Sequence, residues 1–114
     1  MIILLTSCAN IQPHKSISST IIIKTPTLKF YDTGFISYYD DYIHLQLLSV
    51  GNTLFDISIY KEKICESTFK CIPSSQFNQK YLDISYKDDF LYNLLQKKRI
   101  YFKDIKKKIL IKVK

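Results

Sequence analysis

Two short runs in the middle of the chain alternate apolar and polar residues. From Ile43 to Leu47, and again from Phe55 to Ile59, every second residue is apolar and the residues between them are polar. Successive side chains of a β-strand point to opposite faces of a sheet, so each run predicts a strand with one apolar face. Val50-Gly51-Asn52 stands between the runs and predicts a hairpin turn. An antiparallel hairpin with one face to bury therefore limits the chain to folds built around a sheet.

The size and composition of the chain indicate one globular domain. Its 114 residues are enough for a single core and leave little room for a second. With 46% hydrophobic and 14% aromatic residues, the chain is too apolar to be disordered. Nine Tyr and seven Phe, against two Gly and three Pro, favour strands over helices.

Other apolar or aromatic runs predict strands on both sides of the central hairpin. They lie at residues 21–23, 28–31, 35–39, 64–65, 100–102 and 109–113. Gly34 interrupts an aromatic stretch and is predicted to mark a bulge or bend. Turns are expected at Asp40-Asp41 and at residues 61–63.

Two short helices are predicted after residue 73, where the alternation ends. One of the serines at 74–75 is expected to cap a helix that runs to about Tyr81 and carries Phe77 inward. One of the aspartates at 88–89 is expected to cap a second helix, in which Phe90, Leu91, Leu94 and Leu95 share a face. The predicted fold class is α+β, an antiparallel sheet of about five to seven strands with one or two short helices packed on one face.

The first eight residues resemble the end of a bacterial lipoprotein signal peptide. An apolar run leads into Leu5-Thr6-Ser7-Cys8, which looks like a lipobox. In that motif two small residues let a membrane peptidase reach the backbone, and the cysteine thiolate accepts diacylglycerol before cleavage. A signal peptide also needs a basic segment and a longer apolar stretch, so residues 1–7 are interpreted as its last part, with the true translation start upstream. The alternative makes residues 2–5 a buried first strand and Cys8 an ordinary core thiol.

Lipid on Cys8 places the protein at a membrane. Three acyl chains anchor a protein firmly, since two lipid signals already suffice. By analogy with lipoprotein sorting, Ala9 after the cysteine, where Asp would retain a lipoprotein, favours the periplasmic face of the outer membrane over the inner membrane. Residues 8–19 are rich in polar residues and are predicted to be the lipidated tether, and residues 20–114 to be the globular domain.

The remaining cysteines predict a disulfide. With Cys8 assigned to lipid, Cys65 and Cys71 form an even pair in an oxidising compartment. A bond between them closes a short loop, worth about 2–3 kcal/mol by the loop model. The chain has only His14 and His44 as histidine ligands and no Cys-x-x-Cys, so neither a metal site nor a redox site is predicted.

The stretch from Leu45 to Ile57, LQLLSVGNTLFDI, resembles the hairpin of LolB-like outer-membrane lipoproteins. The order of strand, glycine turn and apolar strand is shared, and the resemblance covers residues 28–65 together with the lipid-anchor signal. The chain also looks like short lipoproteins of epsilon-proteobacteria. The resemblance implies an incomplete β-barrel-like meander under a helical lid, whose apolar interior accepts the acyl chains of lipoproteins in transit.

The positive charge of the chain lies at its C-terminal end. Residues 97–114 carry nine Lys or Arg and one Asp, net +8, whereas residues 1–96 carry eight basic and nine acidic residues, net −1. Such a segment is expected to face anionic phospholipid, lipopolysaccharide phosphates or an acidic envelope-protein partner. The alternative is that lysines on an edge strand only discourage edge-to-edge pairing. The residues concerned are Lys97, Lys98, Arg99, Lys106, Lys107, Lys108, Lys112 and Lys114.

No arrangement of residues in the sequence predicts catalysis. The chain has no Ser-His-Asp pattern and no phosphate-binding glycine loop, and its paired aspartates at 40–41 and 88–89 fit a turn and a helix cap. Neither cofactor, metal nor nucleic acid is expected. The sequence predicts a lipid-anchored, non-catalytic envelope lipoprotein that accepts or carries acyl chains. The alternative is a structural or accessory subunit of an envelope complex, recruiting partners through its basic C-terminal strand.

Overall fold

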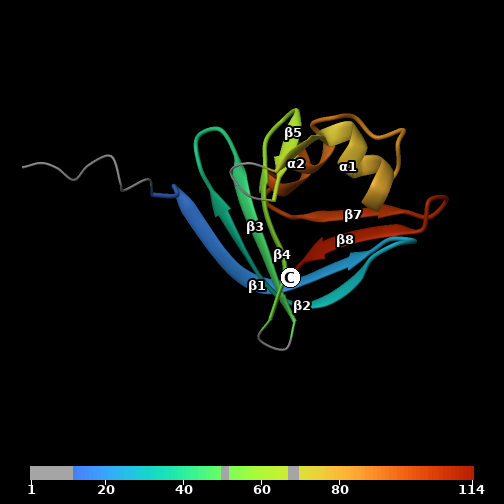
Figure 1. Ribbon diagram of the computed structural model, residues 1–114. Coiled ribbons are helices and arrows are strands. Elements are labelled where there is room, and N and C mark those ends of the chain that lie inside the picture. The colour runs from blue at the N-terminus through green and yellow to red at the C-terminus, as the bar shows by residue number, and fades with distance from the viewer. Residues whose placement is uncertain (1–11, 50–51, 67–69) are drawn as a thin grey trace, which may run out of the picture.

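The computed structural model describes residues 12–49, 52–66 and 70–114, and it has the α+β class predicted from the sequence. Eight strands form one antiparallel sheet in the order β6-β5-β4-β3-β2-β1-β8-β7, which does not close into a barrel (Figure 1). The prediction of five to seven strands was therefore slightly low. The elements are β1 Lys15–Lys24, β2 Lys29–Tyr38, β3 Ile43–Ser49, β4 Asn52–Ile59, β5 Lys63–Cys65, β6 Cys71–Pro73, α1 Ser74–Tyr81, α2 Phe90–Leu95, β7 Tyr101–Asp104 and β8 Ile109–Val113.

The sheet joins the two ends of the described chain. β1 pairs along its whole length with β2, and its other edge pairs with β8, so that Ile21 lies opposite Val113 (Figure 1). The backbone N–H of Lys114 donates to the carbonyl of Thr20 at 3.0 Å and extends this pairing past the end of β8. Residues that are about ninety positions apart in the sequence are thus neighbours on the sheet.

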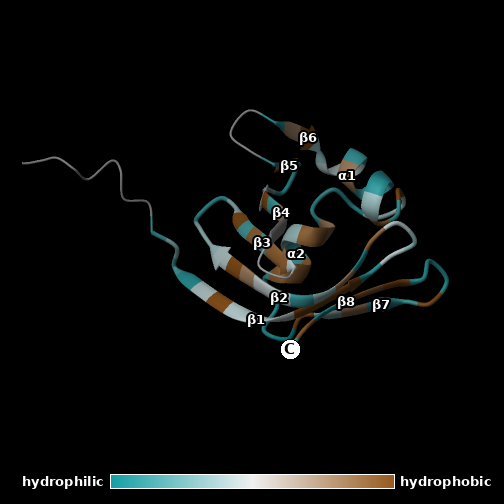
Figure 2. Cartoon of the chain, turned by 60° about the horizontal axis from the view of Figure 1, so that its bottom comes forward, coloured by the Kyte–Doolittle hydropathy of each residue, from teal (hydrophilic) through white to brown (hydrophobic). Residues whose placement is uncertain are grey.

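Strand alternation places the apolar residues on one face, the inner face. Ile36, Leu45 and Ile57 lie opposite one another on β2, β3 and β4, and all three are buried. The sheet curves around α1 and α2, which cover this face, and α2 is largely hydrophobic (Figures 1 and 2). The core therefore lies between the inner face and the two helices.

The first strand begins earlier than predicted. β1 starts at Lys15, whereas the tether was expected to extend to residue 19 and the domain to begin at 20. Ile17 lies opposite Ile36 and packs against the core, so the polar stretch around it is the outer part of a long hairpin. The lipobox, Cys8 and the alternative strand at residues 2–5 lie outside the described residues.

The expected caps of both helices were wrong in detail. Pro73 holds the N-cap position of α1 and offers no side-chain acceptor, while Ser74 is already inside the helix, its N–H donating to the carbonyl of Glu62 at 3.0 Å. Its hydroxyl is buried without a hydrogen-bond partner in the described part of the chain. Asp89 is the N-cap residue of α2, but its side chain makes no capping hydrogen bond. Packing against the sheet, more than capping, holds these short helices.

The structure confirms two predicted turns but not the bulge or bend predicted at Gly34. The predicted turns at residues 40–41 and 61–63 are present, closed by hydrogen bonds from Tyr39 N–H to Tyr42 O and from Tyr60 N–H to Lys63 O, both 2.9 Å. The central hairpin is present as β3 and β4, with its tip at residues 50–51 outside the described part. The bulge or bend expected at Gly34 was wrong, because β2 runs through this position in regular register.

Candidate functional site

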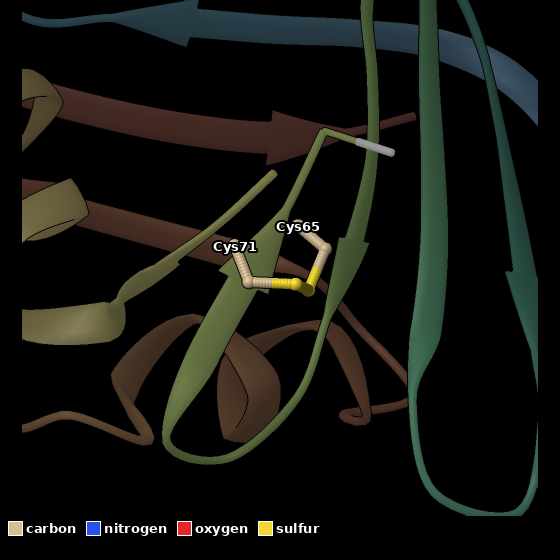
Figure 3. Close-up of a disulfide and its surroundings, with 2 residues drawn as sticks. All are labelled: Cys65 and Cys71. Carbon is tan, nitrogen blue, oxygen red and sulfur yellow. A yellow bond between two sulfur atoms is a disulfide. The ribbon is translucent and has the colours of Figure 1, made fainter. Parts of the chain in front are cut away.

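The disulfide predicted from the sequence is present at one end of the sheet. Cys65 of β5 and Cys71 of β6 lie directly opposite each other, with their Cα atoms 3.9 Å apart, and their sulfurs are bonded (Figure 3). Cys65 is buried and Cys71 is exposed. Because Ser74 follows β6 immediately, the bond also ties down the start of α1.

An apolar cavity lies between the inner face of the sheet and the helices. Its volume is about 40 Å³. It is lined by Ile21, Ile23, Leu28, Ile36, Leu45, Leu47, Phe55, Ile57, Phe77, Tyr81, Leu82, Leu91, Leu95, Ile111 and Val113. Cavities with such walls stay dry, and a volume of roughly 150 Å³ is known to admit benzene. The interior is therefore nearly filled by its own side chains.

Polar contacts hold the helical layer, which consists of α1, α2 and the segment between them, over this cavity. The hydroxyl of Tyr38 on β2 donates to the carbonyl of Leu95 at the end of α2. Asn78 of α1 donates through Nδ2 to the carbonyl of Lys87 at 3.0 Å, which fixes the segment between the helices. Burial raises the pKa of Tyr38, so its hydroxyl stays protonated and able to donate.

A second polar cluster joins the inter-helix segment to the end of β7. The Tyr86 hydroxyl donates to Asp104 Oδ2 at 2.7 Å, and Lys107 Nζ lies 3.6 Å from Asp83 Oδ2. Burial, and then the hydrogen bond to Asp104, raise the pKa of Tyr86. The same hydrogen bond is the main cause that lowers the pKa of Asp104. These groups stabilise one another and bind the inter-helix segment to the sheet.

The structure divides the predicted basic segment into three groups. Residues 97–99 lie in the connection from α2 to β7, and residues 106–108 form the turn at the opposite end of the β7–β8 hairpin. Lys112 lies on β8 opposite Tyr101, and Lys114 follows β8, so both lie at the end of the hairpin where residues 97–99 enter β7. The hairpin reverses the chain, so it returns Lys112 and Lys114 to the start of β7 and leaves residues 106–108 at the opposite end. The edge-strand alternative fails for Lys112, because β8 is paired on both sides, by β1 and by β7.

Sequence reasoning missed the residues that join Lys112 and Lys114 on the sheet. Tyr31 and Tyr101 are 61% and 47% exposed on the face opposite the helices, the outer face. Lys114 Nζ donates to the Tyr31 hydroxyl at 3.0 Å, and this bond lowers the pKa of Tyr31. We call the group the outer patch. It comprises Lys24, Lys29, Tyr31, Tyr101, Lys103, Lys112 and Lys114.

The histidines and paired aspartates do not form a joint site. His14 bonds to Asp40 and His44 bonds to Asp56, in two exposed pairs on different parts of the sheet. Within residues 12–49, 52–66 and 70–114, no three His, Cys, Asp or Glu side chains come together as potential metal ligands. In the same residues, no helix has the length and apolar character needed to cross a membrane.

Comparison of the chain with protein families, with curated proteins and with solved structures gives no match.

Proposed function

We propose that this chain is a lipid-anchored, non-catalytic lipoprotein of the bacterial cell envelope that accepts an acyl chain between its sheet and its helices. The observation that supports the acyl-chain site is the wholly apolar cavity under the helices on the inner face. An open sheet whose concave side is covered by two short helices also agrees with the architecture that the resemblance to LolB-like lipoproteins implies.

The energetics allow the site to open. Each CH₂ group that leaves water contributes about 0.8 kcal/mol, so an acyl chain of some ten carbons contributes several kcal/mol in total. Opening breaks the hydrogen bond from Tyr38 on β2 to the Leu95 carbonyl of α2, which is worth about 1 kcal/mol net. It also separates apolar contacts of α2, which the acyl chain replaces. A cavity of about 40 Å³ must therefore enlarge by displacement of the helices before a chain enters.

Binding of a dansyl-labelled fatty acid tests the acyl-chain site. The full chain carrying Cys8→Ser, and therefore free of lipid, is expected to bind the probe saturably and to release it to unlabelled palmitate. Leu45→Phe places extra ring atoms into the cavity and should weaken binding, while the volume-conserving Leu45→Met should not. Wild-type affinity in Leu45→Phe, or no saturable binding at all, contradicts the site.

Intact mass spectrometry tests the anchor separately. Protein purified from native membranes should begin at Cys8 and carry acyl mass, and it should gain two hydrogens on reduction of the disulfide. An unmodified chain that retains Met1 would contradict the lipid anchor and return Cys8 to the alternative of an ordinary thiol.

A second candidate function, an accessory subunit of an envelope complex, is favoured by a different observation. β7 is an edge strand of the sheet, so one of its two sides is open to pairing with a strand of a partner. The exposed Lys103 lies on this strand. A stoichiometric partner in native extracts that dissociates from a Lys103→Glu variant would support the subunit function, and a monomer in such extracts would favour the carrier.

A further inference from the structure

We infer that the outer patch docks the domain on an anionic phospholipid bilayer, so that the helices face away from the membrane. This inference rests on the proposed function, which locates the protein at a membrane. It adds a second contact with that membrane, one that does not involve the lipid on Cys8. The acyl-chain site does not use the aromatic and basic side chains of the outer face.

Strand register arranges six of the seven patch residues in two rows across four strands, which Ile22 and Leu110 complete, and Lys114 lies just past β8 beside Tyr31. In the order β7, β8, β1, β2, the first row is Tyr101, Lys112, Ile22 and Tyr31, and the second is Lys103, Leu110, Lys24 and Lys29. Neighbouring strands lie about 4.8 Å apart, so each row spans roughly 15 Å. Side chains in directly opposed positions share a face, and the patch is therefore one continuous surface.

The charge of this surface has one sign. Five lysines lie on it, and neither acidic residue of the four strands does: Asp32 lies opposite Ile21, on the inner-face register, and Asp104 bonds to Tyr86. In the described part of the chain, none of the five lysines forms a salt bridge. Their charge is thus free to attract lipid phosphates, and a lysine near an anionic membrane contributes about fivefold in affinity.

The aromatic side chains suit the same environment. Tyrosine rings combine an apolar body with a polar hydroxyl and accumulate at the level of lipid headgroups. Tyr31 and Tyr101 occupy the two ends of the first row, with Ile22 and Lys112 between them. Rings separated by two strands do not form the closely spaced platform on which successive nucleotide bases stack. The geometry therefore favours a bilayer surface over single-stranded nucleic acid.

Cosedimentation with lipid vesicles tests the inference on the unlipidated full chain, Cys8→Ser. Binding is expected to vesicles that contain phosphatidylglycerol, and not to vesicles of phosphatidylcholine alone. Lys24→Gln combined with Lys112→Gln should weaken binding about 25-fold, from about fivefold for each lysine. The matched control, Lys61→Gln with Lys80→Gln, removes the same charge beside α2 and α1, where Lys61 lies over Tyr92 and Lys80 over Tyr81. It should change affinity by about twofold or less, because salt screens distant charges.

Three outcomes overturn the inference. They are equal binding to neutral vesicles, an equal loss of affinity in the control variant, and binding of a single-stranded oligonucleotide in place of vesicles. Failure here leaves the lipid anchor and the acyl-chain site untouched, because those are measured by mass spectrometry and by displacement of the labelled fatty acid. Conversely, an unlipidated native chain that still binds anionic vesicles would contradict the anchor alone.

Discussion

The side chain of Ile21 fills the space on the inner face of the sheet that a side chain at Gly34 would need. A Cβ atom at position 34 would collide with Cδ1 of Ile21 and would lie 3.1 Å from Cδ2 of Leu47. Ile21 is 2% exposed and Leu47 is fully buried, so neither side chain moves without cost to its neighbours. A side chain at position 34 must therefore displace the tip of Ile21 in the packing between β1, β2 and β3.

Gly34→Ala should lower the free energy of unfolding by about 1–3 kcal/mol, because the added methyl group overpacks the core. Chemical denaturation measures this change. In an Ile21→Val background, which lacks the colliding Cδ1, the same substitution should cost clearly less, and a double-mutant cycle gives the coupling. Equal costs in the two backgrounds would show that Ile21 is not the constraint.

Lys108→Gly should raise the free energy of unfolding by about 0.5–1 kcal/mol. Lys108 has a φ of 59° in the turn between β7 and β8, a left-handed conformation that costs a side-chain-bearing residue about 1–2 kcal/mol. Glycine avoids that cost and loses part of the gain to the greater entropy of the unfolded chain. Lys106→Gly in the same turn is the control and should destabilise, since Lys106 has no such strain to relieve.

Reduction of the Cys65–Cys71 disulfide should lower the free energy of unfolding by about 2 kcal/mol, as expected for a short closed loop. Thermal or chemical denaturation with and without reductant measures the change. Hydrogen exchange should speed up first in β5 and β6, which lie at the end of the sheet. Uniformly faster exchange across β1 to β3 would instead show that the bond stabilises the whole core.

Tyr86→Phe should remove a pH-dependent part of the stability. The folded-state pKa of Tyr86 is raised, so its contribution is fully present below the unfolded pKa of about 10 and is lost as the pH rises above it. The wild type should therefore exceed Tyr86→Phe in stability at pH 7–9, and the difference should shrink above pH 10. The same hydrogen bond should make the free energy of unfolding depend on pH in acid as well. The pKa of Asp104 is lowered in the folded state, so the stability that it adds is lost as the pH falls below about 4.

Tyr38→Phe should loosen the helical layer and raise acyl-chain affinity. Losing the hydrogen bond from Tyr38 to the Leu95 carbonyl should cost about 0.5–1.5 kcal/mol of stability and increase affinity for a labelled fatty acid about 2- to 10-fold. Tyr39→Phe is the control, because Tyr39 stacks on Tyr42 in the neighbouring turn. Lower affinity in Tyr38→Phe than in the control would show that this bond does not hold the site closed.

The sequence by itself determined the elements whose signals are local. The alternation at residues 43–47 and 55–59 predicted β3 and β4, the helical spacing of apolar residues after 88 predicted α2, and the odd count of cysteines pointed to the Cys65–Cys71 bond. The strand and helix signals depend on residues a few positions apart, because strand and helix periods express themselves over such distances. The disulfide prediction depended instead on the cysteine count of the whole chain, with Cys8 assigned to lipid.

Only the tertiary structure decided how those elements meet. The pairing of β1 with β8 places Tyr31 beside Lys114. It also gives β8 a paired strand on each side, although its lysines suggested an edge strand. Gly34 reads locally as a bulge, and only the approach of Ile21 gives its actual role. Strand order in an antiparallel sheet depends on contacts between residues far apart in the chain, and a period-two pattern specifies which face is buried but not which strand lies beside it.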